Sequence, residues 1–140
     1  MKTLTHLLDT SVYSQRLRPE PHPEVVRRWS TLGDHRLGIS AICEAELLYG
    51  LEKRNSTRLW QEYRSALENK LTLFTVDLGV ARQFATLKVH MERVGQPRAD
   101  FDLLIAATAL RHNLILATGH IRHFEGMPSL RVENWFEREE

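Results

Sequence analysis

The sequence lacks the features that mark several familiar classes of protein. Its 140 residues include one cysteine, Cys43, so no intrachain disulfide can form and CxxC zinc ribbons are excluded. No apolar run approaches the length of a membrane span, and the first residues, MKTLTHLLDTS, become polar too soon for a signal peptide. We also find no internal repeat and no low-complexity tract. These absences favour a cytoplasmic globular protein that has no membrane partner.

An excess of charge of either sign is also missing. The chain has 19 Lys and Arg against 18 Asp and Glu, which gives a formal net charge of +1. Any binding to nucleic acid must therefore use a local basic patch, because the whole molecule is not a polycation. Hydrophobic residues make up 42% of the chain, which is ordinary for a globular protein. The length suffices for one sizeable core, and we expect a single domain over residues 1–140.

Short apolar runs alternate along the chain with segments that have helical spacing. The runs with the length and composition of strands are residues 4–8, 36–40, 71–76 and 114–118. Helical spacing is found in residues 25–32, 41–53, 59–67, 78–94 and 101–113. Ser40 and Asp77 stand where N-caps of two of these helices are expected. Alternation of this kind predicts an α/β fold with a mostly parallel sheet.

In such sheets, functional sites form beyond the carboxyl ends of the strands. Polar residues occur at four places next to the predicted strands and the buried helix. They are Asp9, Thr10 and Ser11, then Glu44 and Glu46, then Asp100 and Asp102, and finally His120. Four separate segments could therefore meet at one edge of the sheet, and three of them bring acids. Three or more carboxylates together would form a site for a hard cation such as Mg²⁺ or Mn²⁺.

Each acid also has a purely structural interpretation. Asp9 could be a turn or cap residue after a strand. We expect either Asp100 or Asp102 to be the N-cap of the buried helix that follows. Helical periodicity does not decide between Glu44 and Glu46, because both have apolar neighbours one turn away. The residues alone therefore leave the set of ligating acids open.

Four segments together resemble the PIN-domain ribonucleases and, among them, the VapC-type toxins of toxin–antitoxin pairs. The segments are HLLDTSVYS, ISAICEAELLYGL, DFDLLIAATAL and LATGHIRHFEGMPSLRVENW. They follow the family's order from about residue 4 to residue 135. Each pattern alone is loose, whereas four in the right order are fairly specific. The resemblance implies a three-layer α/β/α fold with a central, mostly parallel sheet.

The resemblance also implies a set of site residues. The family's catalytic and metal-binding acids fall on Asp9, Glu46 and Asp102, with Asp100 as a candidate secondary ligand of Mg²⁺ or Mn²⁺. Thr10 would orient the first aspartate or a metal-bound water, and Ser11 stands where the family often has Asn. The residues that would contact RNA are Thr10, Ser11, Arg16, Arg18, Arg122 and His123.

One position departs from the family's pattern. Thr118 matches, but two residues later the family commonly has Asn or Asp, and this chain has His120. The change removes a negative charge. It would weaken a second metal site, favour Mn²⁺ over Mg²⁺, or place a proton donor near a scissile phosphate. The alternative is that His120, Arg122 and His123 form a solvated loop.

The function that the resemblance implies is metal-dependent hydrolysis of RNA phosphodiester bonds by the toxin of a toxin–antitoxin pair. The expected partners are RNA, a cognate antitoxin whose tail enters the acidic groove, and a second copy of the chain in a homodimer. The exposed helix faces around Trp60 and Tyr63 are a candidate interface, although aromatic residues at helical spacing are more often part of a core.

Two alternatives stay open at this point. One is a PIN-like module that binds RNA or protein without catalysis, which only His120 favours. The other is a metal-dependent phosphatase with Asp9 as nucleophile. The haloacid-dehalogenase pattern requires a second aspartate two residues after the first, where this chain has Ser11.

Overall fold

Five short parallel strands form one sheet in the computed structural model, which describes residues 3–138. The strands are β1 (His6–Leu8), β2 (Leu37–Ser40), β3 (Thr72–Phe74), β4 (Ile115–Thr118) and β5 (Val132–Asn134). Their order across the sheet is β3-β2-β1-β4-β5, and every neighbouring pair is parallel. The predicted α/β class is confirmed. The expected single domain over residues 1–140 extends beyond the described range at both ends.

Helices connect the strands. Within residues 3–138, the five longer ones agree with the predicted segments, whereas the four short ones were not predicted. The helices are α1 (Thr10–Tyr13), η1 (Ser14–Leu17), α2 (Pro23–Leu32), η2 (Asp34–Arg36), α3 (Ala41–Arg54), α4 (Thr57–Ala66), α5 (Leu78–Arg93), α6 (Asp100–Arg111) and α7 (Ile121–Phe124). Two of the longer helices begin at the predicted caps. The Ser40 hydroxyl accepts from the backbone N–H of Cys43, and the Asp77 carboxylate accepts from that of Val80.

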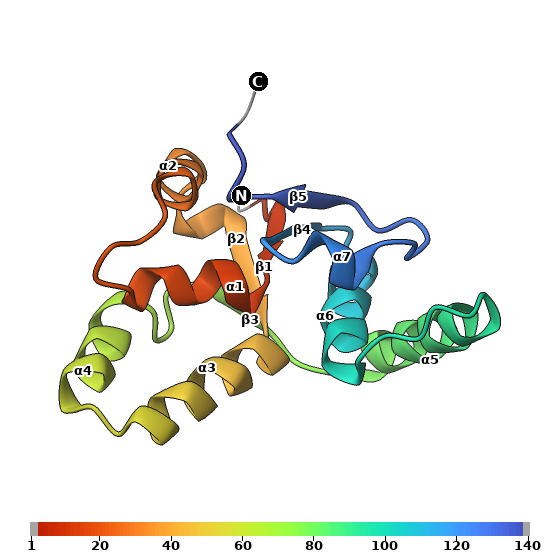
Figure 1. The fold of residues 1–140 in the computed structure, drawn as a ribbon, viewed down its shortest axis with the longest axis horizontal. Coiled ribbons are helices and arrows are strands. Elements are labelled where there is room, and N and C mark those ends of the chain that lie inside the picture. The colour runs from red at the N-terminus through yellow and green to blue at the C-terminus, as the bar shows by residue number, and fades with distance from the viewer. Residues whose placement is uncertain (1–2, 139–140) are drawn as a thin grey trace.

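Two apolar clusters lie on opposite faces of the sheet. Leu7 and Leu8 are successive residues of β1 and enter different clusters, because side chains alternate between the two faces of a strand. Helices α1, α2 and α4 contribute to the cluster of Leu8, whereas α5 and α6 contribute to the cluster of Leu7 (Figure 1). The implied three-layer α/β/α arrangement is therefore present. Cys43 is a fully buried packing residue of the second cluster.

Of the two aromatic residues at the candidate interface, Tyr63 is only 4% exposed and belongs to the core, which agrees with the alternative interpretation of its spacing. Trp60 is partly buried and contacts the Tyr63 ring edge-on, with 6.0 Å between the ring centroids. The helical spacing of these aromatic residues reflects core packing. The most exposed large apolar side chains include Tyr49, Leu78 and Phe101. No helix within residues 3–138 combines the length and apolar character that crossing a bilayer requires.

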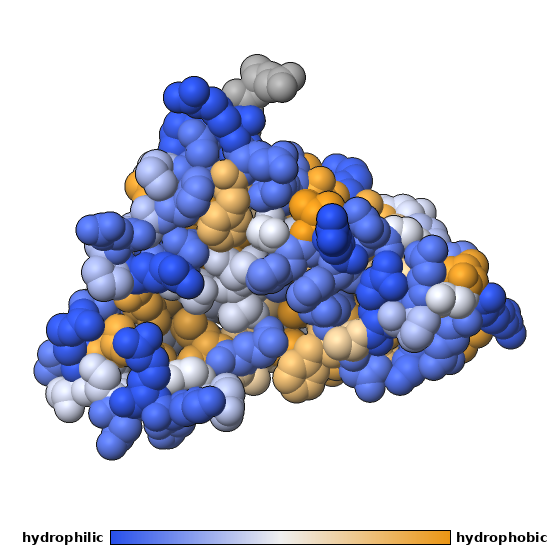
Figure 2. Space-filling model, viewed as in Figure 1, coloured by the Kyte–Doolittle hydropathy of each residue, from blue (hydrophilic) through white to orange (hydrophobic). Residues whose placement is uncertain are grey.

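The carboxyl ends of the central strands bring distant segments together. Leu8 pairs with Ala117, so the residues that follow β1 lie beside the end of β4. The backbone N–H of Asp9 continues this pairing by donating to the Ala117 carbonyl at 2.9 Å. Figure 2 shows that the face above this edge is hollowed near its centre, with hydrophilic side chains around the hollow.

Candidate active site

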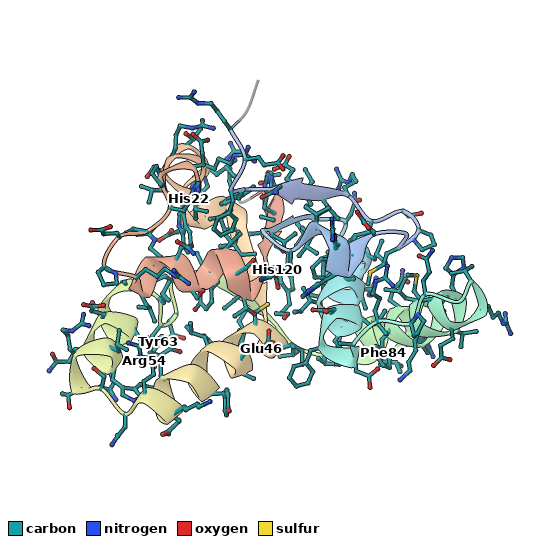
Figure 3. All side chains as sticks on the ribbon, in the orientation of Figure 1. His22, Glu46, Arg54, Tyr63, Phe84 and His120 are labelled. Carbon is teal, nitrogen blue, oxygen red and sulfur yellow. The ribbon has the colours of Figure 1, made fainter. Side chains whose placement is uncertain are left out.

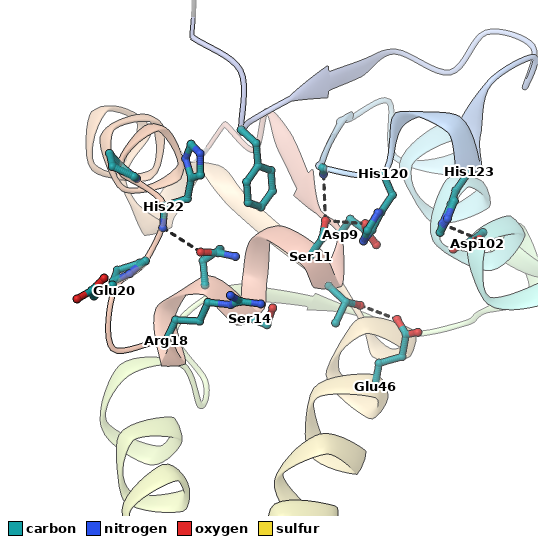
Figure 4. A pocket seen from close by; sticks show the side chains of 16 residues that line it. Asp9, Ser11, Ser14, Arg18, Glu20, His22, Glu46, Asp102, His120 and His123 are labelled. Carbon is teal, nitrogen blue, oxygen red and sulfur yellow. Dashed lines mark hydrogen bonds and ion pairs between the residues drawn. The ribbon is translucent and has the colours of Figure 1, made fainter.

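A cavity of about 940 Å³ lies at the carboxyl edge of the sheet. Asp9, Glu46 and Asp102 all line it, although they come from the end of β1, from α3 and from α6 (Figure 4). Figure 3 shows Glu46 near the start of α3. The structure therefore groups the three acids that the family resemblance selects. The other predicted site residues on its walls are Thr10, Ser11, Arg18, His120 and His123.

Asp9 occupies the N-cap position of α1, but its carboxylate makes no capping hydrogen bond. Instead, Oδ2 accepts from the Thr118 hydroxyl at 2.7 Å and from the Ser11 hydroxyl at 3.0 Å. The residue is only 5% exposed. Within residues 3–138, its Oδ1 accepts no hydrogen bond. The interpretation of Asp9 as a simple cap residue is therefore set aside, because the fold anchors one carboxylate oxygen and leaves the other open.

Glu46 is held by Thr10, whose hydroxyl donates to Glu46 Oε1 at 2.5 Å. This hydroxyl therefore orients Glu46 and not Asp9, and the alternative role of Thr10 in orienting a metal-bound water stays a prediction. Glu44 has a different role, since its carboxylate accepts from the hydroxyl of Tyr13 at 3.1 Å. The geometry thus decides between the two glutamates on α3, and only Glu46 faces the cavity.

The prediction that Asp100 or Asp102 caps α6 is also wrong, because the N-cap is Ala99. Asp100 is already the first helical residue, and its carboxylate accepts from Lys88 Nζ at 2.7 Å. It does not line the cavity, so the candidate secondary ligand lies apart from the other acids. The Asp102 side chain is 23% exposed and lies 3.4 Å from Nδ1 of His123.

The electrostatic surroundings of Asp102 disfavour its charged form. Burial raises the pKa of this carboxyl above its ordinary value, the nearby His123 opposes that change, and the negative charge of Asp9 adds to it. The pKa remains raised overall, so the histidine compensates only in part. Carboxylates that share a cavity repel each other unless a cation or a proton intervenes. This end of the cavity is therefore suited to a cation.

Carboxylate oxygens are the donors that Mg²⁺ and Mn²⁺ prefer. Asp9, Glu46 and Asp102 thus fit such an ion by their chemistry, and the open Oδ1 of Asp9 supplies one donor without breaking a hydrogen bond. Within residues 3–138, however, no three His, Cys, Asp or Glu side chains form a ready-made cage around one ion. The three carboxylates line the same cavity, but in this arrangement they are not close enough together to bind one ion.

His120 and His123 form a stacked pair at the edge of the cavity. Their ring centroids are 4.8 Å apart with 12° between the planes, and both residues are exposed. The backbone N–H of His120 donates to the Thr118 hydroxyl at 2.8 Å. Because the same hydroxyl donates to Asp9, Thr118 links the histidine loop to the first carboxylate.

The predicted RNA-contacting arginines are not all at the cavity. Arg18 lines it. Arg16 lies 4.3 Å from the centroid of the Trp29 ring and 3.5 Å from Asp34, on a different surface. Arg122 borders a neighbouring hollow. Among the predicted cationic contacts, the cavity thus brings together Arg18 and His123.

The sequence analysis missed several residues that line the cavity, and it also missed the role of Thr118. Gln15, His22 and Phe136 form its opposite end, and no motif indicated them. Thr118 matched the family's pattern at the strand end, but its bond to Asp9 was not anticipated. The available signal for Thr118 was its place as the polar residue that ends an apolar strand.

Comparison with known proteins assigns the chain to a family. The family model described as the PIN domain matches residues 6–124, which is most of the chain. The chain belongs to the PIN-domain family. The matched range includes all three acids of the cavity.

Two curated relatives and one solved structure place this PIN-domain chain more closely. It is 28% identical over 132 residues to a tRNA(fMet)-specific endonuclease VapC from Salmonella typhimurium, covering 94% of this chain and 98% of the relative. It is 35% identical over 120 residues to the toxin FitB from Neisseria gonorrhoeae, covering 80% and 85%. The crystal structure of FitAcB from Neisseria gonorrhoeae superposes with a TM-score of 0.87 at 28% identity, covering 96% and 100%. The predicted resemblance to VapC-type toxins is confirmed.

Proposed function

We propose that this PIN-domain protein is a metal-dependent endoribonuclease that acts as the toxin of a toxin–antitoxin pair. The observation that carries the proposal is the grouping of Asp9, Glu46 and Asp102 around one cavity at the carboxyl edge of the sheet. The relatives support the reaction and the role, since they are named as an endonuclease and a toxin. Their alignment extends over most of the chain, and so does their similarity in fold.

Asp9, Glu46 and Asp102 would hold Mg²⁺ or Mn²⁺. When bound, such an ion neutralises charge on phosphate oxygens and acidifies water. The protein prepares its ligands through hydroxyl groups. Thr118 and Ser11 fix Asp9 with one oxygen open, and Thr10 fixes Glu46. Two ligands are thus restrained before the ion arrives, which reduces the entropy lost on binding.

The basic groups at the cavity would position the RNA backbone. His123 lies beside Asp102. The ring of His120 stacks on the ring of His123 at the edge of the cavity. Arg18 lies on the wall formed by the segment after α1. These side chains would contact phosphate without specifying sequence. A local set of this size is consistent with a net charge near zero, because only the groove needs to be basic.

A cognate antitoxin is the protein partner in this proposal. Its basic side chains would compete with the metal for the carboxylates of Asp9 and Asp102, which repel each other in the empty groove. A homodimer is the further predicted assembly. The exposed apolar side chains of Tyr49 and Phe101 are more suitable for such contacts than the buried Tyr63.

The test is cleavage of a mixed tRNA and rRNA substrate by antitoxin-free protein with Mg²⁺, Mn²⁺ or EDTA. We expect discrete cuts that require a metal ion. Asp102→Asn should lower the rate by on the order of 100-fold or more, because metal coordination provides several kcal/mol of charge stabilisation. The matched control is Asp100→Asn, which makes the same change two residues away on the same helix. It should cut normally, because Asp100 pairs with Lys88 outside the cavity.

Two outcomes would replace the proposal. Folded protein that binds RNA but makes no cuts with either metal would indicate a binding module without catalysis. Hydrolysis of a small phosphomonoester with intact RNA would indicate a phosphatase. A preference for Mn²⁺ would support participation of His120, because imidazole suits softer ions better than carboxylate does.

A further inference from the structure

The cavity extends well beyond the three acids. Its opposite end is formed by η1, by the loop before α2 and by the segment after β5, where Gln15, His22 and Phe136 lie. Figure 4 shows His22 and Asp102 on opposite sides of the cavity, with Asp9 and Ser11 between them. One continuous space therefore joins the acids to a region of different chemistry.

Phe136 is held firmly at that end. Its backbone N–H donates to Asn134 Oδ1 at 2.9 Å, and its ring packs against the core cluster of α1, α2 and α4. A Cβ atom at Gly119 would lie 2.6 Å from the ring, so the close approach requires glycine. The His22 ring contacts Phe136 edge-on, with 5.0 Å between centroids and 67° between planes. These contacts fix an aromatic ring on the cavity wall.

Gln15 places an unused donor in the same region. The residue is only 7% exposed, and its Oε1 accepts from the backbone N–H of His22 at 2.9 Å. The amide nitrogen Nε2 is therefore directed elsewhere, and within residues 3–138 it has no hydrogen-bond partner. The buried side-chain atoms without a partner within residues 3–138 do not include Nε2, so this donor is open to the cavity that Gln15 lines and is available to a ligand.

His22 adds a second donor. Its Nδ1 accepts from the backbone N–H of Glu24 at 3.2 Å and so caps α2. In the neutral ring the proton must then be on Nε2, which has no partner within residues 3–138. An aromatic ring and two N–H donors, together with the carboxylate of Glu20, thus line the end of the cavity opposite Asp9, Glu46 and Asp102.

We infer that this end of the cavity is a subsite for one unpaired nucleobase of the RNA, beside the phosphodiester that is cut. Proteins bind the bases of single strands by stacking them on aromatic side chains and by hydrogen bonds to their edges. Phe136 supplies the stacking surface, and Gln15 and His22 donate to acceptor atoms of the base edge. The inference rests on the proposed ribonuclease function, and it makes Phe136 a determinant of where the RNA is cut.

The test is a cycle that combines changes in the protein and in the RNA. A short single-stranded RNA that the protein cuts is compared with the same RNA made abasic at the nucleotide on either side of the cut. At one of these positions the abasic change should lower kcat/KM of the unaltered protein about 10-fold to 100-fold, as expected for a lost base stack. Phe136→Ala should cause a similar loss on intact RNA, and the abasic change should then cause no further loss. If the abasic change lowers kcat/KM by the same factor in the Phe136→Ala variant as in the unaltered protein, the inference is overturned.

Two further variants separate stacking from folding. Phe136→Leu retains apolar volume without an aromatic ring, so it should resemble Phe136→Ala, whereas Phe136→Tyr should retain the sensitivity to the missing base. Phe84→Ala is the matched control, because Phe84 is also a partly buried phenylalanine but packs on the other cluster, away from the cavity. It should leave the abasic effect unchanged.

Binding distinguishes a failure of this inference from a failure of the proposed function. Fluorescence anisotropy with the same labelled RNAs is measured on the Asp102→Asn protein, with and without Phe136→Ala. Coupled losses of affinity without any cleavage by unaltered protein would support the subsite and refute the ribonuclease. Affinity that is indifferent to the base and to Phe136 would refute the subsite, and this end of the cavity would then be open to an antitoxin side chain.

Discussion

Glu133 and Asp102 are partly buried carboxylates of the same molecule in opposite surroundings. Glu133 Oε1 accepts from His6 Nε2 at 2.9 Å and from Trp135 Nε1 at 3.2 Å. Burial raises the pKa of Glu133, but these hydrogen bonds outweigh it, and the pKa is lowered overall. Asp102 has His123 at 3.4 Å and the negative charge of Asp9 nearby, and its pKa is raised.

The difference shows how the fold treats an acid that it uses for stability and one that it keeps for a ligand. The donors for Glu133 come from β1 and from the residue after β5, so hydrogen bonds inside the protein stabilise its charged form. For Asp102, the nearby His123 offsets only part of the cost of burying the charged carboxylate. Groups whose pKa is shifted by burial and by a like charge in a cleft are candidates for function. We therefore expect a cation from outside the chain to balance the charge of Asp102.

The largest expected difference between the site acids and Glu133 is in the stability that added metal gives to the folded protein. Mn²⁺ or Mg²⁺ should stabilise the folded protein, by about 2.7 kcal/mol when its concentration is 100 times the dissociation constant. Thermal unfolding at graded MnCl₂ concentrations measures the effect. Asp9→Asn should abolish most of it, because it replaces the carboxylate that has an open oxygen. Glu133→Gln is the control and should respond as the unaltered protein does. An equal response from Asp9→Asn would place the ion elsewhere.

Removing the paired acid should cost stability and leave the chemistry intact. Glu133→Ala should lower the free energy of unfolding by about 1 kcal/mol, because two hydrogen bonds are lost from a side chain that is 43% exposed. Its metal-dependent cleavage per folded molecule should not change. Asp102→Asn should show the reverse pattern in urea unfolding with EDTA, with no loss of stability. A destabilised Asp102→Asn protein would mean that the acid is structural.

Much of the fold follows from local sequence. The helices α3 and α5 begin where Ser40 and Asp77 were expected to cap them. The strands were predicted because buried parallel strands are short continuous apolar runs. The rule that sites form at the carboxyl ends of strands then pointed to Asp9 and to the end of β4. The family resemblance was needed to choose Glu46 and Asp102.

What the sequence could not supply were contacts between segments. Thr10 follows Asp9 in the chain but bonds to Glu46 on another helix. The cap of α6 was misjudged because a carboxylate can favour a helix N-terminus from several positions, and Asp100 pairs with Lys88 instead. The far end of the cavity depends on Phe136 meeting His22, more than a hundred residues away in sequence, which no local pattern encodes.

The smallest expected difference between the two acids is in the pH dependence of stability without metal. The pKa of Glu133 is lowered from 4.5 in the folded state, so its stabilisation is present above that value and is lost as the pH falls through the folded pKa. The pKa of Asp102 is raised from 3.8, so the folded state gains on protonation. That gain is complete below 3.8 and is lost as the pH rises through the folded pKa.

The two substitutions should therefore change the acid limb of the stability curve in opposite directions. Thermal unfolding in EDTA between about pH 3 and 6 spans the ordinary titration range of both carboxyls. Glu133→Gln should lose less stability on acidification than the unaltered protein, because a group that must be protonated has gone. Asp102→Asn should lose more, because the gain from protonating Asp102 is missing. Both effects are small, since solvent reaches both side chains. Parallel curves for the two variants would mean that the contrast between the paired and the unpaired acid does not exist in solution.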